Sequence, residues 1–197
     1  MAGISKISGS TRWSGGAANG SVVVDGDADP ERGFVDLGDA VRKIWIDLGV
    51  RIRFPESDLL QATREAKPEN VPYFAVGTVE YVSDADPAPE GKILYIKPTV
   101  RGDEWAADVI AYSRANPSFP HQSTADQWFD EPQLEAYRAL GYLIMKEILD
   151  VVRERNAGPA NLDELFRRLK WIDPKTLRRK SAAPDTQQWT RFVGRSG

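Results

Sequence analysis

The sequence predicts a mixed α/β protein. Three observations lead to this prediction: a strand–helix–strand unit, an antiparallel pair of strands and a long C-terminal helix. Residues 1–21, rich in Gly, Ser and Ala, are expected to be a flexible leader. Residues 22–156 are expected to form the folded body, and residues 157–197 a short helix with a basic tail.

The strand–helix–strand unit covers residues 22–54. The apolar run Ser21 to Val24 stops at Asp25-Gly26, as a buried strand does before a turn. Asp36 is expected to cap the helix that follows, and Gly49 to end it. The apolar face of this helix is predicted from residues at helical spacing: Leu37, Ala40, Val41, Ile44 and Leu48. Alternation of apolar and arginine residues over 50–54 then predicts a strand that Pro55 stops.

The antiparallel pair is predicted from two runs rich in Val, Ile, Tyr and Phe, at 73–82 and 92–100. Residues 83–91 between them are turn formers, which favours a direct connection between antiparallel strands. Residues 56–71 are charged and predicted to be irregular, and a helix is expected over 104–115.

The long helix is predicted from Glu131 to Arg155, with Pro132 in its first turn. Its expected apolar stripe consists of Leu134, Tyr137, Leu140, Ile144, Ile148 and Val151. Gly158-Pro159 breaks the chain, and Asn161 begins a short amphipathic helix. The apolar face of that helix is predicted to hold Leu162, Leu165, Phe166 and Leu169.

Composition excludes several classes of site. The chain has no cysteine, which rules out disulfides, thiolate zinc sites and cysteine nucleophiles. A net charge of −3 argues against nucleic-acid binding. The sequence shows no signal peptide and no apolar run long enough to span a bilayer, so we expect a cytoplasmic protein or one peripheral to a membrane.

The acidic run from Asp25 to Asp36 places carboxylates at positions that mimic a calcium-binding loop. The position that needs a glycine for a sharp turn is Pro30, whose φ is locked. We therefore expect a strand-to-helix loop whose acids cap a helix. No metal and no cofactor is predicted.

A polar loop cluster, made of His121, Ser123, Thr124 and Asp126, invites comparison with a hydrolase triad. Members of a triad normally come from separate loops, and no G-x-S-x-G nucleophile elbow occurs in the chain. The alternative is that Ser123 or Thr124 hydrogen-bonds the loop backbone while His121 tethers the loop.

The basic tail is the third feature with a functional interpretation. Residues 167–197 hold nine Lys and Arg against two Asp. Either the tail is simply solvated, or it contacts anionic lipid headgroups or phosphates. The residues concerned are Arg167, Arg168, Lys170, Arg178, Arg179 and Lys180, interleaved with Trp171 and Trp189.

Three segments carry a family resemblance: Lys92 to Pro98, Phe119 to Asp130 (FPHQSTADQWFD) and Gln133 to Gly141. Together they closely resemble the C-terminal stretch of large bacterial patatin-like phospholipases. Asp25 to Pro30, Phe34 to Leu37 and Arg42 to Val50 are similar to the preceding strand, loop and helix of those proteins, so the resemblance covers about residues 22–150. It implies a three-layer α/β/α fold and lipid acyl hydrolysis.

The same resemblance implies a serine–aspartate dyad, with the serine on a G-x-S-x-G elbow and a Gly-rich oxyanion hole. The elbow and the Gly-rich stretch are missing from this chain, and its leader has no aspartate. Asp25-Gly26 is similar to the family's Asp-Gly motif, but its neighbours match the following strand, so Asp25 is not assigned as catalytic.

We therefore expect the C-terminal part of a patatin-like lipid acyl hydrolase, inactive alone, with no assigned catalytic or substrate-binding residue. The expected partner is the missing N-terminal half of the domain or a homologous chain. The alternatives are an accessory protein that completes the fold of a partner, and a module that binds anionic lipid through its basic tail.

Overall fold

The computed structural model confirms the mixed α/β class, with four strands in one sheet and helices around it. It describes residues 19–54, 58–61, 72–81, 90–101, 106–123, 125, 128–153, 157–169 and 172. Most of the expected leader, the connector between the antiparallel strands and nearly all of the basic tail lie outside these residues.

The sheet has the strand order β1-β4-β3-β2. β1 (Asn19–Val24) runs parallel to β4 (Glu90–Ile96), in a register that pairs Val24 with Ile96. β3 (Phe74–Glu80) is antiparallel to β4 and to the short β2 (Arg51–Arg53). The antiparallel pair is thus confirmed, and β1 begins at Asn19, before the expected start of the folded body.

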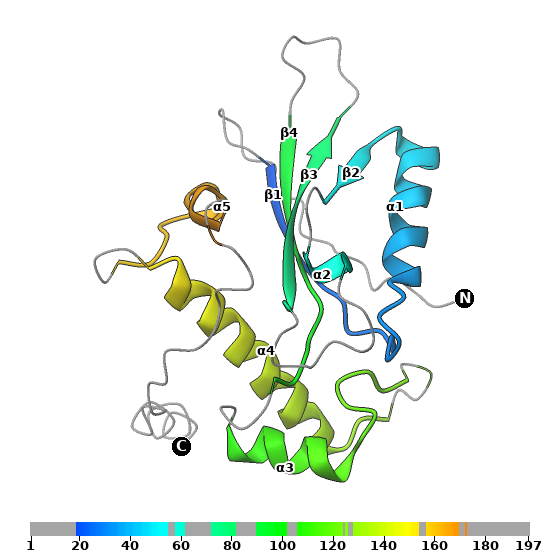
Figure 1. The fold of residues 1–197 in the computed structure, drawn as a ribbon, viewed down its shortest axis with the longest axis vertical. Helices are drawn as coiled ribbons and strands as arrows, with labels where there is room; N and C mark the ends of the chain where they lie inside the picture. Colours follow the sequence, from blue (N-terminus) through cyan, green and yellow to red (C-terminus); the bar gives the residue numbers. More distant parts are fainter. Residues whose placement is uncertain are drawn as a thin grey trace.

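Helices lie on both faces of this sheet (Figure 1). One face is covered by α4 (Glu131–Val151) and α5 (Leu162–Leu169), with α3 (Ala107–Ala115) packed against α4. The other face meets α1 (Val35–Leu48) and the short α2 (Asp58–Gln61). No helix in the described part of the chain is long and apolar enough to cross a membrane.

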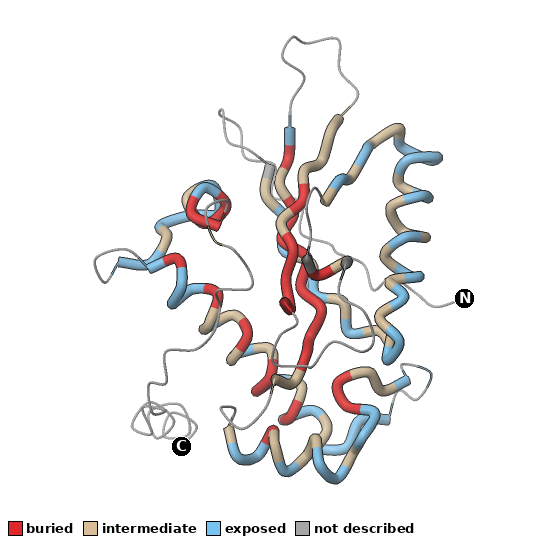
Figure 2. Tube along the Cα trace, in the orientation of Figure 1, coloured by how far each residue is buried: buried red, intermediate tan, exposed pale blue. Residues whose placement is uncertain are grey.

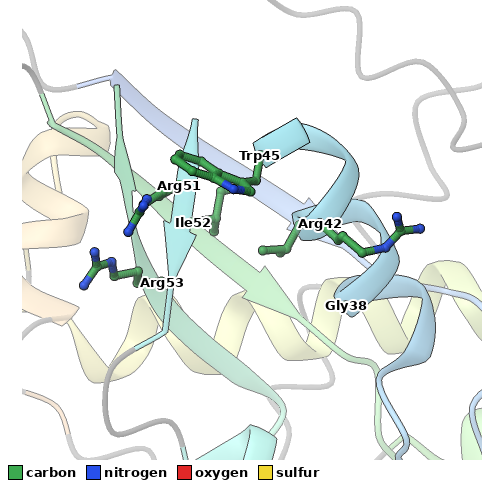
Figure 3. A pocket seen from close by; sticks show the side chains of 7 residues that line it. Gly38, Arg42, Trp45, Arg51, Ile52 and Arg53 are labelled. Atoms are coloured by element: carbon green, nitrogen blue, oxygen red, sulfur yellow. The ribbon is translucent and has the colours of Figure 1, made fainter. Parts of the chain in front are cut away.

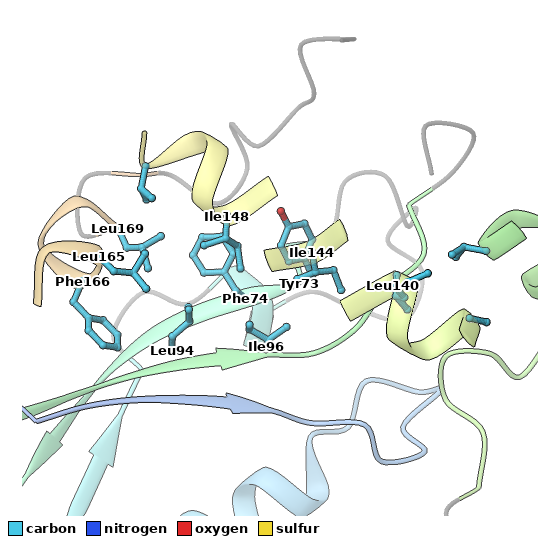
Figure 4. Packing of buried hydrophobic residues seen from close by; sticks show 14 of the residues in the cluster. Tyr73, Phe74, Leu94, Ile96, Leu140, Ile144, Ile148, Leu165, Phe166 and Leu169 are labelled. Atoms are coloured by element: carbon cyan, nitrogen blue, oxygen red, sulfur yellow. The ribbon is translucent and has the colours of Figure 1, made fainter. Parts of the chain in front are cut away.

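The main core lies between the sheet and the α4–α5 side (Figure 4). Phe74, Leu94 and Ile96 point from β3 and β4 toward Leu140, Ile144 and Ile148 on α4, and all six are at most 1% exposed. The predicted stripe of the long helix is therefore right at its centre and wrong at its ends. Leu134 is 58% exposed and Val151 38%, because Ala136 and Ala139 occupy the buried face instead.

The opposite face has a much smaller core, formed by Leu59, Ala75 and Tyr95. Leu37 and Phe34 pack against it, yet α1 has no buried residue, and Figure 2 shows this helix in the tan and pale blue of intermediate and exposed residues. The period of α1 is as predicted, but Leu48 is 68% exposed because the end of the helix extends past the small core.

The ends of three helices can be compared with the sequence. Gly49 closes α1 in the left-handed region at φ 66°, as expected. The expected cap Asp36 is wrong: Phe34 is the N-cap, and Asp36 lies in the first turn. Asp130 caps α4 by accepting from the Gln133 amide at 2.8 Å, and Asn161 caps α5 by accepting from the Glu164 amide at 2.9 Å.

The helix α5 contacts both β1 and the segment that follows α4. Phe166 lies over Gly20 of β1, where an added Cβ would sit 2.6 Å from the phenyl ring. Arg168, which is 9% exposed, donates to the carbonyls of Val152 at 2.7 Å and Ala157 at 3.0 Å and pairs with Glu164. Leu162 is 45% exposed, so Arg168 rather than Leu162 belongs to the buried side of α5.

Candidate functional site

The candidate site is a polar cluster at the carboxyl ends of the parallel strands β1 and β4. Asp25 directly follows β1 and Lys97 directly follows β4, and the Asp25 amide donates to the Ile96 carbonyl at 2.8 Å. The Lys97 ammonium lies 3.1 Å from the Asp25 carboxylate, and the lysine side chain is 1% exposed. Carboxyl ends of parallel strands are the usual location of ligand sites in α/β sheets.

Tyr95 completes the surroundings of Asp25. Its hydroxyl donates to the second carboxylate oxygen, so that both oxygens of Asp25 are engaged, one by Tyr95 and one by Lys97. Burial, followed by the hydrogen bond to Asp25 and the charge of that carboxylate, raises the pKa of Tyr95 far above its ordinary value. Tyr95 therefore remains a hydrogen-bond donor to Asp25.

The loop between β1 and α1 is fixed by its own acids. Asp25 accepts from the Asp27 amide at 3.0 Å, and Asp29 accepts from the amides of Gly33 and Phe34 at 2.8 and 2.9 Å. Phe34 and Arg32 have positive φ angles of 50° and 52° in this loop. These hydrogen bonds stabilise the left-handed residues, and they occupy carboxylates that a calcium loop would need as ligands.

His121 and Arg32 close the cluster from outside. Burial, followed by the charges of Lys97 and Arg32, lowers the pKa of His121, while a hydrogen bond to the Asp27 backbone opposes the shift. Arg32 donates to the Thr99 hydroxyl at 3.5 Å. Among the described residues, nothing hydrogen-bonds to the buried Nη1 of Arg32 or Nδ1 of His121. These atoms are the unused hydrogen-bonding capacity of the cluster.

The predicted loop cluster is only partly described, since Thr124 and Asp126 lie outside the described residues. Ser123 is exposed, and its hydroxyl oxygen accepts from the Ala125 amide at 3.2 Å, which is the backbone role considered as the alternative. His121 faces Lys97 and Arg32 instead. Within the described ranges, no group of three or more residues has metal-ligating geometry.

The basic tail loses one of its expected contact residues. Arg168 is buried in α5 and bound to two carbonyls, so it is not available to a headgroup. Arg167 is exposed and lies 3.5 Å from Glu164. The remaining members lie outside the described residues: Lys170, Trp171, Arg178, Arg179, Lys180 and Trp189.

Sequence reasoning did not find the cluster around Asp25 and Lys97. The available signal was a charged residue placed directly after each of two apolar strands. Their meeting depends on the parallel pairing of β1 with β4, across 72 residues of chain for the pair Val24 and Ile96. Comparison of the chain with family models, curated proteins and solved structures gives no match.

Proposed function

We propose that this chain forms the C-terminal part of a patatin-like lipid acyl hydrolase fold and does not hydrolyse acyl esters by itself. The resemblance over residues 22–150 supports the family, and the helices on both faces of a mixed sheet are compatible with it. The observation that carries the second half of the proposal is the engagement of Asp25 by Lys97 and Tyr95.

A dyad carboxylate must accept the proton of a serine hydroxyl, which requires an oxygen facing that hydroxyl. Asp25 is the carboxylate at the end of β1, and its described side-chain partners are an ammonium and a phenol, together with the Asp27 amide. The hydroxyl oxygen of Ser123 accepts a hydrogen bond from the Ala125 amide of its own loop. These structural partners of Asp25 and Ser123 support the proposal that the two side chains do not form a dyad.

β1 supports a role in completing a larger sheet. Within the described residues it pairs with β4 alone, so its other edge is open. Parallel strands are normally covered on both faces, yet Val22 is 36% and Val24 59% exposed. An open parallel edge with apolar side chains is a surface for strand addition. The proposed partner is a polypeptide that bears the serine elbow.

The proposed lack of acyl-ester hydrolysis is tested with the full 197-residue chain. A fluorogenic acyl ester and a serine-reactive fluorophosphonate probe should give no turnover and no labelling. Ser123→Ala and Asp25→Asn are the matched variants. Turnover by the natural chain that either substitution removes, with the fold kept by circular dichroism, contradicts the proposal.

The proposed pairing of β1 with a partner polypeptide is tested by affinity purification of the chain from its native host. Val24→Lys places a charge on the exposed face of β1, where it leaves the main core intact and opposes strand addition. A co-purifying acyl hydrolase that is lost with Val24→Lys supports the proposal. The control is Leu134→Lys, an equally exposed apolar residue on α4. Equal recovery with both variants rejects the β1 edge as the interface.

The lipid-binding alternative stays a prediction for the tail. Because α5 packs in the main core, a test by truncation must end after Ile172 rather than within α5. Sedimentation with phosphatidylglycerol vesicles should then compare the full chain with residues 1–172. Equal sedimentation of the two proteins removes the tail as a lipid site.

A further inference from the structure

A groove lies between α1 and β2, on the sheet edge opposite β1 (Figure 3). Its volume is about 450 Å³, and its lining combines an apolar floor with a cationic rim. Val41, Trp45 and Ile52 form the floor. The rim consists of Arg42, Arg51 and Arg53, and Gly38 on α1 leaves the groove open.

The positive charge of this rim is incompletely neutralised. Arg42 pairs with Asp39 on its own helix, and Arg53 pairs with Glu80 of β3 at 3.0 Å. The guanidinium of Arg51 lies 4.2 Å from the centre of the Trp45 ring, and no carboxylate partner of Arg51 occurs among the described residues. The stacked, exposed Arg51 is therefore preorganised for an anionic group.

The groove also adjoins an open strand edge. Within the described ranges, β2 pairs with β3 and with no other strand, so its second edge can accept backbone hydrogen bonds. Arg51 and Arg53 are two residues apart and point to one face of β2, while Ile52 points to the other. The pair of Arg53 with Glu80 shows how a carboxylate on a neighbouring strand meets this face.

We propose that the α1–β2 groove binds an extended acidic peptide, which adds as a strand to the open edge of β2. Carboxylates at alternate positions of the peptide meet Arg51 and Arg53, and the apolar residue between them contacts the floor at Ile52 and Trp45. This peptide site is separate from the β1 edge and does not depend on the proposed function. Main-chain pairing supplies affinity, and the alternating side chains supply selectivity.

The probe is a short fluorescent peptide of alternating glutamate and valine, titrated with the full chain by fluorescence anisotropy. Three probes separate the contributions: the alternating peptide, a peptide of the same composition with its glutamates in one block, and a lysine–valine peptide. The alternating acidic peptide should bind most tightly. Binding that is equal for the block peptide or the lysine peptide overturns the proposal, as does the lack of binding.

Variants locate the site. Arg51→Glu with Arg53→Glu should weaken binding by about tenfold or more, because both rim charges are reversed. Gly38→Trp should also weaken it, since a side chain at Gly38 meets nothing within 4 Å of its Cβ and can fill the groove. Arg138→Glu on α4 is the control and should leave binding unchanged. Circular dichroism checks that each variant is folded.

Other anions are explicit outcomes of the same experiment. Pyrophosphate and phosphatidylglycerol vesicles are titrated into the natural chain and the double arginine variant. If either one binds through Arg51 and Arg53 while the alternating peptide fails to compete, the site is an anion or headgroup site and the peptide proposal is wrong. Tight binding of the alternating peptide that neither pyrophosphate nor the vesicles displace supports the proposal.

Discussion

Asp25 and Lys97, which are 72 residues apart in the sequence, form a buried ion pair at the carboxyl ends of β1 and β4. The Lys97 ammonium lies 3.1 Å from the Asp25 carboxylate. The lysine is 1% exposed and the aspartate side chain 12%. Desolvation of a charge in such a place is compensated only while its partner is present. The pair therefore fixes how the loop after β1 is attached to the sheet.

Removal of the Lys97 charge should strongly destabilise the protein. Lys97→Met leaves the buried Asp25 carboxylate with the Tyr95 hydroxyl and the Asp27 amide but without its cation, and we expect a loss of about 3–5 kcal/mol in the free energy of unfolding. Urea denaturation measures this loss. Lys92→Met on the same strand is the control and should cost less than about 1 kcal/mol, since its pair with Glu90 is exposed. Equal losses for the two variants contradict the role of the buried pair.

Arg168 and Arg167 provide a neighbouring pair with different burial. Arg168→Ala removes the donor to the carbonyls of Val152 and Ala157 and should cost about 3 kcal/mol. Arg167→Ala should change stability by less than about 0.5 kcal/mol, because that side chain is exposed. Thermal unfolding of both variants is the measurement. A result in which Arg167 matters as much as Arg168 would show that α5 is attached differently.

Two glycines should respond in opposite directions to alanine. At Gly77 on β3, a Cβ would lie 2.7 Å from the Phe54 ring and 2.8 Å from the Arg53 carbonyl oxygen, so Gly77→Ala should destabilise by about 1–3 kcal/mol. At Gly38 a Cβ meets nothing within 4 Å, and alanine should stabilise α1 by up to about 1 kcal/mol. Denaturant midpoints of the two variants decide the sign in each case.

His121, the only histidine, should make stability depend on pH. Its pKa in the folded protein is lowered by burial and by Lys97 and Arg32, with Asp29 and the Asp27 backbone opposing. The unfolded chain therefore binds the proton more readily, so stability is complete above about pH 6.5 and falls as the pH drops below that value. Urea midpoints between pH 5 and 8 should show a slope that His121→Gln reduces. Parallel profiles for the two proteins would contradict this assignment.

Local patterns predicted most elements of the fold, but not α2 (Asp58–Gln61), which lies in a segment predicted to be irregular. The apolar run before Asp25, the period of α1 with Gly49 at its end, and the antiparallel runs all correspond to observed elements. Each of these signals depends on residues close together in sequence. The cap at Phe34 was missed because it depends on a left-handed backbone that Asp29 holds through two amides.

Burial and the polar cluster depended on contacts that local patterns do not contain. Leu134 and Leu48 have the right helical spacing but extend past the elements that would cover them. From the sequence, Arg168 was assigned to the charged tail. Its burial becomes evident only when α5 is placed against Val152 and Ala157. In the sequence, Lys97 is only the residue at the end of a predicted strand. Its partner, Asp25, can be identified only from the parallel register of β1 and β4.

The packing of Phe166 over Gly20 has a consequence for folding during synthesis on the ribosome. The first described strand, β1, is covered in part by the last described helix, α5, so β1 is synthesised long before α5 can protect it. At about 5–20 residues per second, that delay is on the order of 10 s. During this interval the valines of β1 are open to other nascent chains. A chaperone or a partner that recognises β1 would act in this interval.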